Sequence, residues 1–142
     1  MPKAHVEAPV YGSMILAGVL LKMGGYGLIR FIEILINIRI KFNFLIIRVR
    51  IVGRLIVSLI CLVQIDIKRL VAYSSVVHMN IMLCGVLRLT KIGIVGGYIM
   101  IIAHGLCSSG LFYIVNLYYI RSSSRLLILN KGFINKLSGL TL

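Results

Sequence analysis

The chain has 142 residues, of which 60% are hydrophobic, and its mean hydropathy is +1.05. No ordinary soluble domain is that apolar, and no polar stretch is long enough to build a second core, so we expect membrane-spanning helices. The formal net charge is +13, but most lysines and arginines flank or interrupt apolar runs, which argues against a nucleic-acid interface.

The predicted fold is all-α, because the apolar residues recur with a helical period and no strand-like alternation is present. Residues 1–12 hold both prolines and are expected to form a loop or a broken helix. About four transmembrane helices are expected, at about 13–36, 44–65, 70–87 and 94–120. Residues 121–142 are expected to form a basic C-terminal tail. The chain is therefore predicted to be a polytopic membrane protein.

Three of these helices each contain a titratable residue near the middle, namely Lys22, His78 and His104. A charge at mid-bilayer is expensive, so such residues normally face a bundle interior or a water-filled cavity. Burial lowers the pKa of a lysine, and histidine already titrates near neutrality. The pattern indicates a proton pathway. A lone histidine can also simply hydrogen-bond a neighbouring helix, and a lone lysine can extend to the membrane interface.

Serine hydroxyls accompany the two histidines at helical spacing. Ser74 and Ser75 lie four and three residues before His78, and Ser108 lies four residues after His104. We expect these hydroxyls to relay a proton or to hold water beside the imidazole rings. The glycine-rich stretch "GGYG" at 24–27, after Lys22, is expected to let another helix or water approach the backbone closely.

Three stretches carry a specific resemblance: "PKAHVEAPVYGSMILAGVLLKMGGYGLIRF", "SLICLVQIDIKRLVAYSSVVHMNIMLCGV" and "MIIAHGLCSSGLF". They resemble the subunit 4 family of mitochondrial NADH:ubiquinone oxidoreductase (respiratory complex I), an antiporter-like family, most nearly in its arthropod versions. The resemblance implies a fragment of a bundle of about fourteen helices built from inverted repeats. It places Lys22 on the eighth helix, His78 on the tenth and His104 on the eleventh.

The implied function is that of a partial proton-translocating membrane subunit, which couples NADH-to-ubiquinone electron transfer to proton pumping through buried Lys and His residues. The resemblance implies no catalytic residue, metal site or cofactor site on this chain, because NAD, FMN, iron–sulfur clusters and ubiquinone bind elsewhere in the complex. The implied partners are the other membrane-arm subunits and the lipid bilayer, with no nucleic acid, in the mitochondrial inner membrane. Two alternatives stay open: an inactive truncated membrane segment, and a subunit of a cation/proton antiporter.

The chain also departs from the family. The helices expected before "PKAH" and after "NKGF" are missing, so at most half a pathway is expected. Arg48, Arg50 and Arg54 interrupt the second helix, each at a cost of roughly 2.5–3.5 kcal/mol at a helix centre. Arthropod mitochondria read AGA and AGG as serine, and serine at these positions would give an uninterrupted span. Arg69 and Arg88 are two more candidates for the same misreading.

Overall fold

The computed structural model describes residues 2–32, 34 and 36–129. Within this part all regular secondary structure is helical, apart from one isolated antiparallel bridge between Asp66 and Leu126, and short turns join the helices. The helices are α1 (Pro2–Glu7), α2 (Val10–Ile15), the π-helix η1 (Leu16–Leu20), α3 (Leu21–Ile32), α4 (Ile36–Leu62), α5 (Ile67–Leu87) and α6 (Lys91–Ser122). The expected all-α fold is confirmed.

The N-terminal segment is a broken helix. Pro9 has φ −60° and ψ 163° and separates α1 from α2, because proline has no N–H and also restricts the residue before it. After this break α2, η1 and α3 follow one another directly. This helical stretch begins at Val10 rather than at residue 13, and α3 ends at Ile32. The predicted end at residue 36 falls next to residues 33 and 35, which lie outside the described part.

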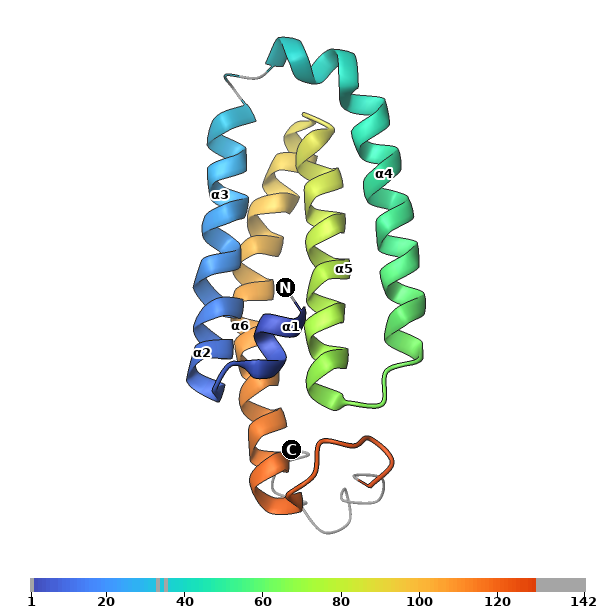
Figure 1. Ribbon diagram of the computed structural model, residues 1–142. Helices are drawn as coiled ribbons and strands as arrows, with labels where there is room; N and C mark the ends of the chain where they lie inside the picture. The colour runs from blue at the N-terminus through green and yellow to red at the C-terminus, as the bar shows by residue number, and fades with distance from the viewer. Residues whose placement is uncertain (1, 33, 35, 130–142) are drawn as a thin grey trace.

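The helices lie side by side along a common direction (Figure 1), with α4 against α5, α5 against α6, and α6 against the stretch from α2 to α3. The short helix α1 packs on α5. Two groups of buried apolar side chains hold this arrangement together. One consists of Ala17, Val71, Ala72 and Phe112, and the other of Ile32, Met82, Val86 and Ile101.

Three helical stretches of the described chain are long and apolar enough to cross a membrane: Val10–Ile32, Ile67–Leu87 and Lys91–Ser122. The fourth predicted span is different. Helix α4 has 27 residues and begins at Ile36 rather than at residue 44. At 1.5 Å per residue it is about 40 Å long, which suffices to span a bilayer. The composition of α4 is less suited to a membrane span than its length, because Arg48, Arg50 and Arg54 lie on its exposed surface.

Candidate functional site

Lys22 lies one residue after the first residue of α3 and points towards α6. Its Nζ donates to the carbonyl oxygen of Ala17, lies 3.0 Å from Nδ1 of His104 and is 3.5 Å from Oγ of Ser108. Ala17 belongs to η1, and π-turns of this kind are frequent at functional sites. A lysine and a histidine that are 82 residues apart in the sequence are therefore direct neighbours.

Glycine allows this close approach between α6 and the lysine. A Cβ added at Gly105 would lie 3.2 Å from Cε of Lys22 and 3.4 Å from the carbonyl oxygen of Gly18. Of the "GGYG" glycines, Gly25 is in tight contact, because a Cβ there would lie 3.1 Å from Cε of Met82. Gly24 and Gly27 have no described atom within 4 Å of such a Cβ. Within the "GGYG" stretch, the predicted close approach of another helix is therefore seen at Gly25, and Gly105 on α6 provides a second one.

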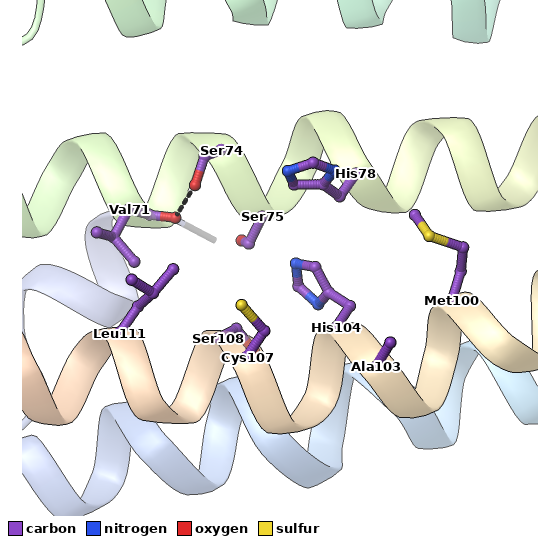
Figure 2. Close-up of a pocket in the computed structure, with 10 residues that line it drawn as sticks. All are labelled: Val71, Ser74, Ser75, His78, Met100, Ala103, His104, Cys107, Ser108 and Leu111. Carbon is purple, nitrogen blue, oxygen red and sulfur yellow. Dashed lines mark hydrogen bonds between the residues drawn. The ribbon is translucent and has the colours of Figure 1, made fainter. Parts of the chain in front are cut away.

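The imidazole rings of His78 and His104 face one another between α5 and α6 (Figure 2), with their centroids 5.7 Å apart and their planes tilted by 52°. Both rings border a pocket of about 220 Å³. His104 is half-buried, whereas His78 is exposed within the described chain. The pocket is lined by Val71, Ser74, Ser75, His78, Met100, Ala103, His104, Cys107, Ser108 and Leu111.

The three serines predicted to support the histidines all line this pocket. Ser74 donates to the carbonyl oxygen of Val71 at 2.8 Å, and Ser75 donates to that of Ala72 at 2.7 Å. Each hydroxyl oxygen retains lone pairs that can accept a hydrogen bond from water. Ser108 is buried and is the serine that reaches Lys22.

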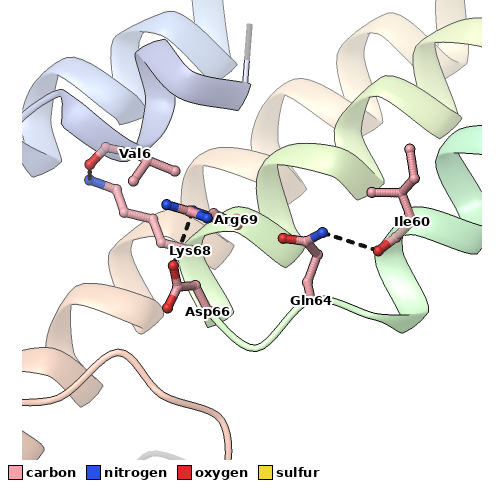
Figure 3. A network of polar contacts seen from close by, with 6 residues as sticks. All are labelled: Val6, Ile60, Gln64, Asp66, Lys68 and Arg69. Carbon is pink, nitrogen blue, oxygen red and sulfur yellow. Dashed lines mark hydrogen bonds and ion pairs between the residues drawn. The ribbon is translucent and has the colours of Figure 1, made fainter.

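No carboxylate pairs with Lys22 among the described residues. The ion pairs of that part join Lys3 to Glu7 at 3.9 Å, and Arg69 to Asp66 at 3.0 Å (Figure 3). Both lie away from the middle of the spans. The described chain also contains no group of three or more His, Cys, Asp or Glu residues that could hold a metal ion. The amine of Lys22 and the imidazole of His104 are groups that can exchange a proton with one another and with water.

His5, to which the sequence alone assigns no role, is buried in the structure, with 1% of its surface exposed. Its ring stacks on Phe112, with the centroids 5.0 Å apart and an angle of 7° between the planes. In the same segment, Lys68 donates to the carbonyl oxygen of Val6 (Figure 3) and to that of Ala8. The available signal in the sequence was the position of His5, four residues before Pro9. A proline there predicts a helix break, and the backbone carbonyls at a helix end need polar partners.

Comparison with known proteins gives a consistent result. A family model described as NADH:quinone oxidoreductase/Mrp antiporter, TM, matches residues 1–141. The chain is similar to the NADH-ubiquinone oxidoreductase chain 4 of Aedes aegypti, with 55% identity over 100% of this chain and 32% of the relative. The chain 4 of Mytilus edulis is 53% identical over 93% of this chain and 31% of the relative. That of Danio rerio is 48% identical over 93% of this chain and 29% of the relative. The chain thus spans about a third of the length of these curated relatives.

Proposed function

Because this chain belongs to the NADH:quinone oxidoreductase/Mrp antiporter membrane family, we propose that it is a segment of a proton-translocating subunit of NADH:ubiquinone oxidoreductase. In this proposal the segment lies in the mitochondrial inner membrane and contacts other membrane-arm subunits and lipid. The names of the relatives support this assignment. NAD, FMN, iron–sulfur clusters and ubiquinone are proposed to bind on other parts of the complex.

One observation carries the proposal, namely the contact of Lys22 with His104 and Ser108 near the middle of two spans. A lysine there costs roughly 2.5–3.5 kcal/mol on insertion scales, so it is expected to be retained only for a function. Its hydrogen bonds offset part of this cost. Because its Nζ lies 3.0 Å from Nδ1 of His104, Lys22 can release its proton to the imidazole. His104 can pass a proton on to the pocket that it shares with His78.

The proposed path therefore runs from Lys22 through His104 to His78, with Ser108 beside the lysine and Ser74 and Ser75 holding water along the pocket. Each step moves one proton and leaves the donor ready to be reloaded. No electron transfer takes place on these residues. Energy from NADH oxidation is proposed to reach them through a change in the neighbouring subunits or in the parts of the subunit outside this segment.

The test uses a full-length chain 4 homologue that carries this segment, hereafter the parent subunit, assembled in its complex in membrane vesicles. Lys22→Met is expected to lower proton uptake per NADH oxidised, with an unchanged amount of assembled complex. Lys91→Met is the matched control, because Lys91 is an exposed lysine at the start of α6. Normal proton uptake in assembled Lys22→Met vesicles would refute the proposal.

The same vesicles distinguish the two alternatives. A cation/proton antiporter would collapse a pre-formed proton gradient after a pulse of Na⁺ in the absence of NADH, and this exchange would depend on Lys22. An inactive segment would give equal proton uptake in the Lys22→Met and unaltered vesicles. The family model names both oxidoreductases and antiporters, whereas the relatives described above are all NADH-ubiquinone oxidoreductases, which favours the former.

A further inference from the structure

The beginning of α5 and the end of α6 lie at the same end of the bundle (Figure 1), and both border a cavity of about 20 Å³. That volume is enough for one water molecule or one oxygen atom of a ligand. The cavity is lined by Val10, Ser13, Lys68, Phe112, Val115, Asn116, Tyr119 and Arg125. This lining includes two cations and no described Asp or Glu. The proton path proposed above uses none of these residues.

Lys68 is a buried cation that forms no ion pair with a described residue. Its exposed fraction is 7%. Its Nζ donates to the carbonyl oxygen of Val6 at 3.3 Å (Figure 3) and to that of Ala8 at 2.8 Å, which leaves one of the three donors of the ammonium group. The acid nearest in sequence, Asp66, is paired with Arg69 at 3.0 Å. Neutral carbonyls satisfy hydrogen bonds but do not neutralise the charge, so a counter-ion would stabilise Lys68.

Arg125 brings a second positive charge to the same cavity. It lies three residues beyond the end of α6 and is exposed, and its guanidinium carbon is 4.7 Å from the centroid of the Tyr119 ring. Two hydrogen bonds hold the backbone here. The N–H of Ile67 donates to the carbonyl oxygen of Arg125 at 3.1 Å. The N–H of Leu127 donates to that of Ile65 at 2.9 Å. The chain after α6 is therefore fixed against the start of α5.

Two cations at one cavity repel one another unless an anion lies between them. A phosphate group suits this pair, because a guanidinium can bind two phosphate oxygens side by side and an ammonium group binds phosphate as a point charge. The amide of Asn116 can donate to a further oxygen. The cavity has room for one oxygen atom beside Lys68, while the remaining oxygens would face the exposed Arg125.

We propose that Lys68 and Arg125 form a binding site for a phosphate group. Two sources share this chemistry, the headgroup of an anionic phospholipid and inorganic phosphate. Lys68 is the second residue of the Ile67–Leu87 span, and Arg125 follows the end of the Lys91–Ser122 span. Lipid headgroups lie at the ends of membrane spans, and basic pockets between helices bind anionic ones, which favours the lipid. The site goes beyond the proposed function and does not rest on it, since it moves no proton.

The test measures backbone amide exchange of residues 63–69 and 123–129 in the parent subunit, assembled in its complex in lipid nanodiscs. Three conditions are compared: phosphatidylcholine alone, phosphatidylcholine with phosphatidylglycerol, and phosphatidylcholine with inorganic phosphate in the buffer. A bound phosphate group joins the two segments, so it is expected to slow exchange in both by about tenfold. Slowing with phosphatidylglycerol identifies the lipid as the source, whereas slowing with inorganic phosphate identifies the free ion.

Variants at the end of α6 show whether the effect belongs to this cavity. Arg125→Gln is expected to abolish the slowing, and Arg125→Lys to retain part of it, because lysine keeps the charge but cannot bind two oxygens side by side. Arg121→Gln is the matched control, since Arg121 is exposed at the end of the same helix and does not line the cavity. It is expected to leave the slowing unchanged. A native gel measures the amount of assembled complex for each variant.

Two results would overturn the site. One is equal exchange of both segments in all three conditions. The other is an equal slowing in the assembled Arg125→Gln, Arg121→Gln and unaltered complexes, because the anion would then act on the surface charge as a whole. Proton uptake by the Lys22→Met vesicles decides the proposed function in a separate measurement, so the failure of one leaves the other standing.

Discussion

Replacement of Gly105 by alanine should weaken proton transfer between Lys22 and His104 without removing any titratable group. The added Cβ would lie 3.2 Å from Cε of Lys22. Optimal carbon–carbon contacts are about 3.5–4.0 Å, so the lysine carbon must move by about 0.3–0.8 Å. The carbonyl oxygen of Gly18, 3.4 Å from the same Cβ, limits any movement of the helices themselves.

The expected magnitude follows from the hydrogen bond at stake. Nζ of Lys22 is 3.0 Å from Nδ1 of His104, and a movement of several tenths of an ångström takes this pair to the edge of hydrogen-bond distance. The net contribution of one such bond is about 0.5–1.5 kcal/mol. The part of the proton uptake per NADH that depends on Lys22 is therefore expected to fall by about two- to tenfold.

Gly110→Ala provides the matched control on the same helix. A Cβ at Gly110 would meet no described atom within 4 Å. Both substitutions favour the helix by about 0.5–1 kcal/mol, so this effect cancels in the comparison. The assay is NADH-driven proton uptake in vesicles with the parent subunit, normalised to assembled complex. Equal uptake for the two variants would show that the Lys22–His104 distance does not limit transfer.

Three further predictions concern other parts of the chain. His78→Ala should lower proton uptake less than Lys22→Met does, because the serines beside it can hold a water in place of the ring; equal losses in the vesicle assay would contradict this. Gly97→Ala should lower the amount of assembled complex, since the new methyl group would clash with Cγ2 of Val86 and overpacking costs about 1–3 kcal/mol. Gly96→Ala, with no described atom within 4 Å of its Cβ, should leave that amount unchanged. DNA sequencing should find AGA or AGG codons for the three arginines in the middle of α4; CGN codons would exclude a misread serine.

The sequence was enough to predict the helical class and to single out Lys22, His78 and His104. These residues stand out because a titratable side chain within an apolar run has a large transfer cost, which is a property of the local sequence alone. The family resemblance is confirmed by a match over residues 1–141. The bounds of α4 were predicted less well, since its arginines obscured where the apolar run begins.

The partners of these residues depended on tertiary structure. Lys22 meets His104 because η1 and α3 cross α6 at Gly105, and the sequence does not encode the rotation of one helix against another in any local pattern. His5 is buried because the break at Pro9 lets α1 pack on α5, with the imidazole stacked on Phe112. Hydropathy fixes which residues are costly to place in a membrane, whereas helix packing over small side chains decides which of them can exchange a proton.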